Sequence, residues 1–144
     1  MIESLEPRRL MSASLVNGAL TVEGTDLTDQ ISLSVSGKKA NQTLNVKILT
    51  AGVATVQSFK LSEVNTIAIF GYGAADLISV SSSVKIGCVI DGGEGKDLIS
   101  GGGGNDTIFA SGDGAGDLIA GGGGKDTAYV DRFDSANVEK KIFA

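Results

Sequence analysis

Four aspartates recur at nearly even spacing in the carboxyl-terminal half of this 144-residue chain. They are separated by 9, 11 and 9 residues, and each one closes a glycine-rich stretch: Asp97, Asp106, Asp117 and Asp126. Aspartate carboxylates and the inward-pointing carbonyl groups of tight glycine turns are hard oxygen ligands, the kind that Ca²⁺ takes. The spacing of these residues therefore predicts calcium sites.

Each aspartate is the sixth residue of a nine-residue repeat, Gly-Gly-x-Gly-x-Asp-x-apolar-x. The four copies span residues 92–100, 101–109, 112–120 and 121–129. Three of them match at every defined position, with Ala128 as a small apolar residue, whereas the copy at 112–120 has displaced glycines and follows the insertion Ala110-Ser111. The glycines permit a tight turn, and the last three residues of each copy form a short strand. Turn and strand alternate, so the chain is expected to coil.

These copies resemble the hemolysin-type calcium-binding repeats of RTX proteins, whose nonapeptides form a parallel β-roll with calcium held between stacked turns. The resemblance implies that calcium acts structurally and that its ligands lie in the glycine-rich turns. The residues so implied are Gly92, Gly93, Glu94, Gly95, Asp97, Gly101, Gly102, Gly103, Gly104, Asp106, Gly112, Gly114, Asp117, Gly121, Gly122, Gly123, Gly124 and Asp126. The displaced glycines of the third copy predict a weaker or differently built site there.

The spacing also predicts how the copies stack. Alternate aspartates lie 20 residues apart, so one full coil contains two repeats. We expect one ion between the turns that end in Asp97 and Asp117, and another between those that end in Asp106 and Asp126, with backbone carbonyls completing both sites. Glycine-rich aspartate turns also occur without metal. However, carboxylates stacked at the strand spacing of about 4.8 Å would repel one another unless a cation lay between them.

A degenerate copy precedes the regular ones. Residues 71–79 keep the Asp-Leu-Ile-Ser ending of residues 97–100, and Asp76 lies 21 residues before Asp97, about one coil. This turn lacks most of the glycines, and the intervening half-coil at 81–86 has no aspartate. Stacking of Asp76 beneath Asp97 is expected, whereas a third calcium site at Asp76 stays open.

The amino-terminal half consists of short runs rich in Val, Ile, Leu and Thr, which predict strands. These runs are 19–23, 30–35, 43–49, 55–61, 65–70 and 77–80. Residues 24–33 look like a repeat whose glycines have been replaced, so this half is expected to form coils held by packing rather than by calcium. A small β-sandwich is the alternative, because alternating strands do not determine whether the pairing is parallel.

The expected fold is therefore all-β, a parallel β-roll or β-helix solenoid with glycine-rich calcium-binding turns in its carboxyl-terminal half. Side chains alternate in a strand, so Ile99, Ile108, Ile119 and Ala128 should point into a narrow core. We divide the chain into an amino-terminal segment (1–14), degenerate solenoid coils (15–91), the calcium-binding repeats (92–130) and a polar carboxyl-terminal cap (131–144).

The amino terminus carries a second resemblance. Residues 5–13, Leu-Glu-Pro-Arg-Arg-Leu-Met-Ser-Ala, are similar to the LEPR-XLL motif found near the start of large surface and secreted proteins of planctomycete bacteria, with Met11 where leucine is usual. This resemblance implies sorting to the cell surface or exterior, where calcium is abundant enough for weak extracellular sites. A disordered leader is the alternative.

Composition restricts the classes of function. The chain has no histidine, which excludes Ser-His-Asp and Cys-His nucleophilic sites and histidine-ligated metals, so we expect no enzyme. Its net charge of -5 argues against nucleic acid as a partner, and no apolar run approaches the roughly 18 residues of a membrane span. Cys88 is the only cysteine, and its apolar setting predicts a buried, inert thiol.

Two other functions stay open beside a structural calcium module of an extracellular or cell-surface protein. If alternate copies face opposite sides, Leu77, Leu98 and Leu118 form an outward apolar ladder, and Phe109 and Tyr129 align on the other face. Such a face would suit an adhesive module with a protein or glycan partner, unless amino-terminal strands cover it. A glycan-active β-helix enzyme that uses carboxylates is the other candidate.

Overall fold

The computed structural model describes residues 10–143 and is all-β, as predicted. The helical segments among these residues are two three-residue 3-10 turns, η1 (Lys39–Asn41) and η2 (Leu61–Glu63). Residues 5–9 of the amino-terminal motif lie outside the described residues. Strand β1 begins at Ser12, so the boundary that we placed after residue 14 falls inside a strand.

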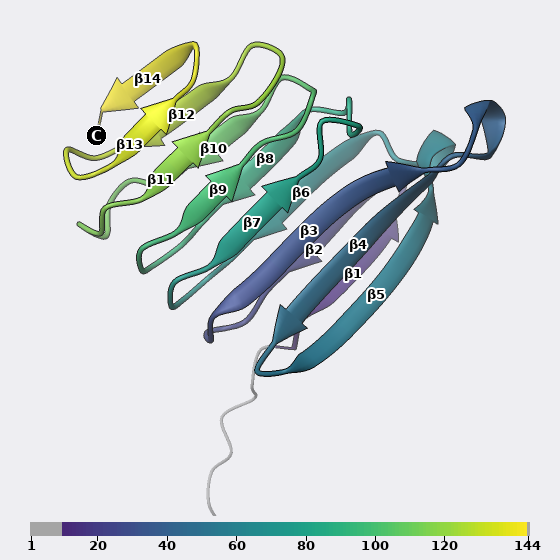
Figure 1. Ribbon diagram of the computed structural model, residues 1–144, viewed down its shortest axis with the longest axis horizontal. Helices are drawn as coiled ribbons and strands as arrows, with labels where there is room; N and C mark the ends of the chain where they lie inside the picture. The colour runs from purple at the N-terminus through teal and green to yellow at the C-terminus, as the bar shows by residue number, and fades with distance from the viewer. Residues whose placement is uncertain (1–9, 144) are drawn as a thin grey trace, which may run out of the picture.

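Among the described residues, fourteen strands form two seven-stranded sheets (Figure 1). The first sheet contains, in spatial order, β1 (Ser12–Val16), β2 (Ala19–Glu23), β6 (Thr66–Phe70), β8 (Cys88–Asp91), β10 (Thr107–Phe109), β12 (Thr127–Val130) and β14 (Lys140–Phe143). The second contains β13 (Ser135–Asn137), β11 (Leu118–Ala120), β9 (Leu98–Ser100), β7 (Leu77–Val80), β3 (Asp29–Ser36), β4 (Thr43–Thr50) and β5 (Val53–Lys60). The six strands predicted in the amino-terminal half agree with these bounds to within two residues.

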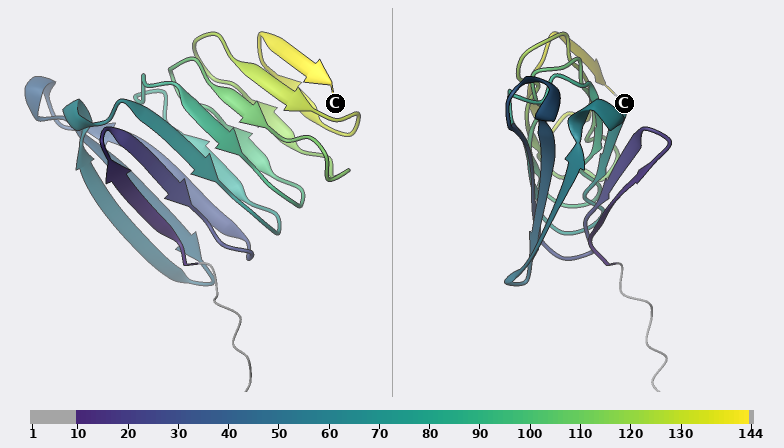
Figure 2. Two further views of the ribbon diagram at one scale, coloured as in Figure 1. Left: turned by 180° about the vertical axis from the view of Figure 1, so that it is seen from behind. Right: turned by 90° about the vertical axis from the view of Figure 1, so that its right-hand side faces the viewer.

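From β6 onward, consecutive strands lie in alternate sheets, and the two sheets face each other (Figure 2). Every strand pair in this part of the molecule is parallel. Leu98 pairs with Leu118, and Thr107 pairs with Thr127, so residues 20 positions apart lie side by side. The stacking period predicted from the aspartate spacing is confirmed.

The amino-terminal end is built differently, which corrects the expectation of purely parallel coils. Strands β2 and β3 pair in parallel with β6 and β7, but β1–β2, β3–β4 and β4–β5 are antiparallel. Two-residue turns explain two of these hairpins: Asn17-Gly18 has φ values of 50° and 82°, and Ala51-Gly52 has 49° and 80°. Positive φ at both turn residues gives the twist that closes a tight hairpin. Both sheets are consequently mixed.

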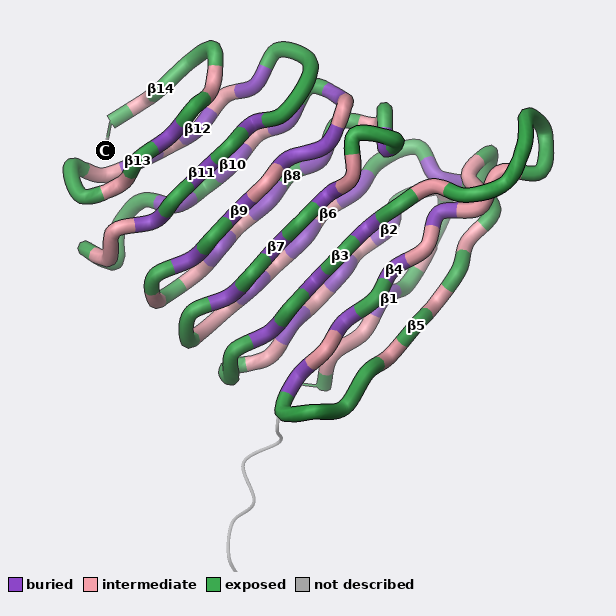
Figure 3. Tube along the Cα trace, viewed as in Figure 1, coloured by how far each residue is buried: buried purple, intermediate pink, exposed green. Residues whose placement is uncertain are grey.

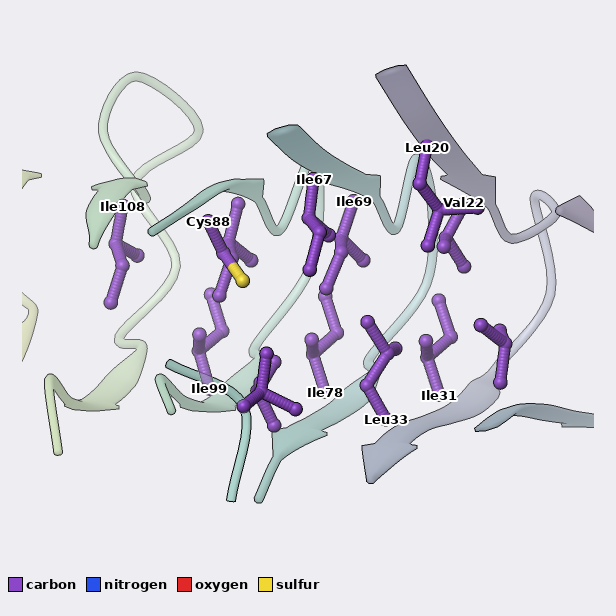
Figure 4. Packing of buried hydrophobic residues seen from close by; sticks show 14 of the residues in the cluster. Leu20, Val22, Ile31, Leu33, Ile67, Ile69, Ile78, Cys88, Ile99 and Ile108 are labelled. Atoms are coloured by element: carbon purple, nitrogen blue, oxygen red, sulfur yellow. The ribbon is translucent and has the colours of Figure 1, made fainter. Parts of the chain in front are cut away.

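The core lies between the sheets as a narrow row of aliphatic side chains. Ile99, Ile108, Ile119 and Ala128 are at most 1% exposed, which confirms the prediction that they point inward. Buried and exposed residues alternate along each strand, as period two requires (Figure 3). Figure 4 shows side chains from the two sheets meeting, with the buried Cys88 among them, as predicted. The core narrows toward the carboxyl end, where Ala136 pairs with Ile119.

Residues 131–143 are more than a polar cap. Strand β13 pairs in parallel with β11, and β14 pairs in parallel with β12, so this segment extends both sheets by one strand. Asp134 and Glu139 directly precede these two strands. They occupy the position that the repeat aspartates have before the preceding strands.

Candidate cation sites in the stacked turns

All four predicted aspartates occupy the same place in their turns, directly before a strand of the core. Asp97, Asp106, Asp117 and Asp126 are each 1% exposed. Aspartate is seldom fully buried unless its charge is paired. Four buried carboxylates in a chain of this size therefore require partners.

Backbone hydrogen bonds link these carboxylates into two columns. In the first column, the N–H of each aspartate donates to the Oδ1 atom of the next: Asp29 to Asp76 (2.8 Å), Asp76 to Asp97 (2.8 Å), Asp97 to Asp117 (2.7 Å) and Asp117 to Asp134 (2.9 Å). In the second column, Cys88 donates to Asp106 (2.7 Å), Asp106 to Asp126 (2.8 Å), and Asp126 to Glu139 Oε2 (2.8 Å). The predicted stacking of alternate aspartates, including Asp76 beneath Asp97, is confirmed.

These backbone hydrogen bonds reach only one oxygen of each carboxylate. The Oδ2 atoms of Asp76, Asp97, Asp117 and Asp126 are buried and accept no hydrogen bond from any described residue. A buried polar atom without a partner costs about 1–3 kcal/mol, and more when it is charged. In the regular turn at 101–106, Asp106 Oδ2 accepts the N–H of Gly102 at 2.9 Å. The unpartnered oxygens are the clearest chemical feature of the molecule.

A glycine carbonyl also lies close to the Oδ2 atom of Asp106. A Cβ atom built on Gly101 would collide with both Asp106 Oδ2 and the carbonyl oxygen of Gly121, one coil further on. The two oxygens, one from each stacked turn, therefore both pack against Gly101, in the place that a side chain would need. The sequence predicts this pairing of turns, and the geometry explains why the first glycine of the repeat has no side chain.

Turns of matching sequence do not all share one backbone conformation. Gly93, Gly95, Gly122 and Gly124 have φ values of 88°, 108°, 93° and 102°, whereas Gly102 and Gly104 of the intervening copy are not in the left-handed region. The turns also bond to each other directly, because the Glu94 N–H donates to the Tyr72 carbonyl at 2.6 Å.

The third copy departs from the pattern, as its displaced glycines predict. Gly112 and Gly114 have φ values of 106° and 74°, but no atom lies within 4 Å of a Cβ built on either one. A side chain at either position would therefore point into open space. Asp113 reaches the turn at 92–97, since its Oδ2 accepts the Gly95 N–H at 2.8 Å. The insertion at residues 110–111 provides the extra chain that places Asp113 there.

Sequence reasoning missed three acidic residues of this region: Asp113, Asp134 and Glu139. Asp134 carries a readable signal, because Asp-Ser-Ala-Asn at 134–137 repeats the Asp-x-apolar-x ending. Its spacing of 17 residues from Asp117, rather than 20, obscures that signal. Glu94 was predicted as a site residue, and its side chain is exposed.

Burial dominates the electrostatics of the first column. Desolvation raises the pKa of Asp76 to about 8 and that of Asp97 to about 7, although backbone hydrogen bonds oppose the shift. Desolvation likewise raises the pKa of Asp117 to about 6, with Asp134 and Asp113 adding to it. The pKa of Asp106 is raised by the same cause. The charged form of each carboxylate is therefore poorly supported by the protein alone.

Side-chain carboxylates are too sparse to surround an ion by themselves. Among residues 10–143, no three or more Cys, Asp or Glu side chains gather in a way that could hold a metal. A cation in these turns would depend on one or two carboxylates together with backbone carbonyls. The glycine-rich turns contain several such carbonyls.

An open groove of about 1020 Å³ lies beside the first column. Its lining includes Phe70 and Tyr72, whose rings stack with centroids 6.0 Å apart, and the acidic residues Asp91, Glu94 and Asp113. Aromatic rings and carboxylates together suit a polyhydroxylated or cationic ligand.

The outer faces of the sheets carry the predicted ladders. Leu77, Leu98 and Leu118 are in register and 38%, 46% and 53% exposed, so the amino-terminal strands do not cover them. On the other sheet, the rings of Phe109 and Tyr129 stack with their centroids 4.8 Å apart.

In the part of the chain that the structure describes, no helix is long and apolar enough to cross a membrane.

Comparison of this chain with protein-family models, with curated proteins and with solved structures finds no match. The evidence for a function therefore comes from the residues of this chain and their geometry.

Proposed function

We propose that this chain is a calcium-binding β-roll module in which the ion acts structurally, between stacked turns. The observation that carries the proposal is the set of buried Oδ2 atoms without a partner, on Asp97, Asp117 and Asp126. The alternation of strands between two facing sheets, with parallel pairing from β6 onward, supports the roll architecture.

The donor set favours calcium over other metals. The turns present carboxylate and carbonyl oxygens, and the chain has no histidine and only one cysteine, which is buried in a strand. Oxygen-only sites with flexible geometry suit Ca²⁺, which takes about six to eight oxygen ligands, better than zinc or copper. The expected ion holders are Asp97 with Asp117, and Asp106 with Asp126, completed by carbonyls such as that of Gly121.

A structural role follows from how little the repeats bury. Strands β9, β10 and β11 have three residues each and bury one isoleucine apiece. The turns between them are mainly glycine, whose ordering is entropically the most costly. A cation that joins carboxylates and carbonyls of successive turns would stabilise what apolar packing alone holds weakly. The column aspartates are buried in this role, which leaves them poorly placed to act on a glycan as an enzyme would.

Calcium titration of the ion-stripped chain tests the proposal. We expect binding by isothermal titration calorimetry, a gain of β signal by circular dichroism, and reversal by a chelator. Asp126→Asn should lower the stoichiometry, because it removes a charge whose Oδ2 has no other partner. The exposed Glu63, which lies in η2 and belongs to neither column, provides the matched control Glu63→Gln. A folded chain that binds no calcium at millimolar concentrations would refute the proposal.

We place the module outside the cell, in a secreted or cell-surface protein. The resemblance of residues 5–13 to a motif of surface proteins supports this location. Extracellular calcium modules bind with dissociation constants of about 10⁻⁴–10⁻³ M, which suits sites made largely of carbonyls. Fractionation of the source cells, with detection of the chain outside or on the surface, tests the location.

An adhesive role is the second candidate, and the groove beside Tyr72 is the observation that favours it. Stacked aromatic rings next to acceptor carboxylates are a common means of holding a sugar ring. Binding to a glycan panel in the presence of calcium, compared with a Tyr72→Ala variant, tests this role. Release of reducing sugar from the bound glycan would instead indicate the enzyme.

A further inference from the structure

A row of outward-facing side chains crosses the first sheet near the carboxyl ends of its strands. The row runs in register from β2 through β6, β8 and β10 to β12, and its members are Glu23, Phe70, Asp91, Phe109 and Tyr129 (Figure 1). The residue that precedes each of them in its strand is buried in the core, so these side chains point away from the core. One acidic residue of the row therefore has an aromatic neighbour on either side.

That acidic residue is Asp91, which pairs with Phe70 on one side and with Phe109 on the other. Adjacent strands lie about 4.8 Å apart, so the two phenylalanines start from backbone positions about 10 Å apart. Asp91 has the shorter side chain, and its carboxylate lies at the base of the interval between the two rings. A planar group that stacks on both rings would fit this interval, with the carboxylate at its edge.

The ring of Phe109 is oriented for such stacking. Its centroid lies 4.8 Å from that of Tyr129, and the two planes differ by 8°. This separation matches the spacing of the strands, so the two rings stack along the row. One face of Phe109 covers Tyr129, and the opposite face is directed along the row toward Asp91. The Phe109 side chain is 38% exposed, which leaves it accessible to a ligand.

The ring of Phe70 has its aromatic neighbour on the other side. Tyr72 stacks on Phe70 with centroids 6.0 Å apart, and the Tyr72 hydroxyl donates to Glu23 Oε1 at 2.6 Å. Glu23 pairs with Phe70 on the side opposite to Asp91. Tyr72 therefore reaches toward β2, away from the Asp91 side of Phe70.

The carboxylate of Asp91 has one oxygen left for a ligand. Its Oδ1 accepts the Gly93 N–H at 3.1 Å, whereas its Oδ2 accepts no hydrogen bond from the described residues. The groove described above opens beside Phe70 and Asp91. Its other acidic lining residues are Asp26, Glu94 and Asp113, and no lysine or arginine of residues 10–143 lines it. The charge of the groove is therefore complementary to a cation.

A planar cation fits both the interval and the charge. The guanidinium group of arginine is planar, stacks on aromatic faces and donates two parallel hydrogen bonds to one carboxylate. The ammonium group of lysine has no plane to stack, and a neutral sugar has no charge to pair with Asp91.

We propose that Phe70, Asp91 and Phe109 form a clip for an arginine side chain of a partner polypeptide. The other carboxylates of the groove favour further basic residues beside that arginine. The clip uses none of the aspartates that form the two columns, so the proposal does not depend on calcium between the turns.

NMR titration of the full chain, with calcium present, tests the clip. The probe is the peptide Gly-Arg-Gly-Arg-Gly, acetylated and amidated, and two comparison peptides carry lysine or citrulline in place of both arginines. Citrulline is planar like arginine but uncharged. We expect the arginine peptide to shift the ring resonances of Phe70 and Phe109, and its own CδH₂ protons to move upfield between the two ring faces. The lysine peptide should bind about fivefold more weakly and the citrulline peptide about tenfold more weakly.

Two variants remove the two parts of the clip separately. Asp91→Asn should weaken arginine binding about tenfold, because it removes the charge but keeps the Oδ1 that accepts the Gly93 N–H. Phe109→Leu should weaken binding about threefold and reduce the upfield shift, because one stacking face is lost. Glu63→Gln removes one charge outside the groove and should leave the dissociation constant unchanged. The remaining resonances of each variant show whether it is folded, so a loss of binding is distinguished from a loss of structure.

Three results would overturn the clip. Equal affinity for the arginine and lysine peptides would show that net charge alone attracts the peptide. Ring resonances that do not shift would show that the peptide binds elsewhere. Ring shifts with a panel of neutral oligosaccharides, and none with the arginine peptide, would assign the row to a glycan instead. The calcium titration of the ion-stripped chain decides the proposed function separately.

Discussion

One end of the first aspartate column and its middle satisfy their carboxylates in different ways. At Asp29, threonine hydroxyls and a backbone N–H complete both carboxylate oxygens. At Asp76, Asp97 and Asp117, one oxygen of each carboxylate is left buried without a partner. The chain itself completes the carboxylate at Asp29, whereas the proposed function assigns the others a ligand from outside.

Packing differs between the same two regions. Strands β3, β4 and β5 have eight residues each and pair through antiparallel hairpins, and several large side chains of β3 and β4 are fully buried. Strands β9 to β11 have three residues each and bury one side chain apiece. The amino-terminal region therefore has the packing to fold without ions, whereas the carboxyl-terminal region depends on them in the proposed function.

Removal of calcium should give the largest difference in stability between the two regions. With a chelator present, we expect amide protection in β9 to β12 to fall about a hundredfold, the effect of losing a ligand held at a hundred times its dissociation constant. Protection in β3 and β4 should change little, because their carboxylate is satisfied internally. Hydrogen exchange with mass spectrometry resolves the two regions, and equal loss of protection in both would contradict the division.

Thr50→Val tests the other side of the comparison. The Thr50 hydroxyl donates to the buried Asp29 Oδ1, and valine has nearly the same shape without the donor. We expect unfolding by urea to show a loss of about 1–3 kcal/mol, because a charged buried acceptor loses a partner. Thr43→Val, at the half-buried opposite end of β4, is the matched control and should stay within about 0.5 kcal/mol. If the two variants lose equal stability, the Asp29 contact has no special role.

The free energy of unfolding of the ion-free protein should fall, rather than rise, as the buried aspartates lose their protons. Burial raises the pKa of Asp76 to about 8, of Asp97 to about 7 and of Asp117 to about 6, so the folded state binds these protons more tightly than the unfolded chain does. The contribution of these groups to the free energy of unfolding should then fall as pH rises from about 4 to 8. Calcium requires the deprotonated carboxylates, so its presence should reverse the trend.

Urea unfolding at several pH values, with and without calcium, measures this effect. Asp97→Asn is the informative variant, because it removes one of the titrating groups and should flatten the ion-free profile. A gain of ion-free stability between pH 5 and 8 would show that the buried carboxylates are stabilised by the protein in a way that their contacts do not explain.

Much of the fold follows from two periodicities that are visible in the sequence. Period two within strands predicts the burial of Ile99 and Ile108, and the 20-residue period of the aspartates predicts which turns stack. The hairpins were missed, although Asn17-Gly18 carries a strong turn signal. Ala51-Gly52 carries a weaker one, because alanine rarely takes positive φ.

The parts of the candidate site that escaped prediction depend on contacts that spacing does not encode. The Thr50 hydroxyl reaches Asp29 because β3 and β4 pair antiparallel, which brings together residues 21 positions apart. No local sequence pattern indicates this pairing. The left-handed Tyr72 and Ala74 are likewise imposed by stacking on the next turn rather than by their own preference. The 20-residue period of the aspartates therefore predicts the columns, whereas tertiary contacts determine which carboxylates have an oxygen without a partner.

The smallest expected effect concerns the outer leucine ladder, which lies on the surface of the region that depends on ions in the proposed function. Leu98 and Leu118 are about half exposed, so replacing both with serine should change the free energy of unfolding by no more than about 0.5 kcal/mol each. Ile99→Ala, at the adjacent inward position, should cost about 2–5 kcal/mol. Light scattering gives the mass of the double serine variant with calcium. A smaller mass than the wild type would show that the ladder joins copies of the chain, whereas unchanged mass and stability would remove the ladder as a docking face and leave the stacked turns as the functional part of this region.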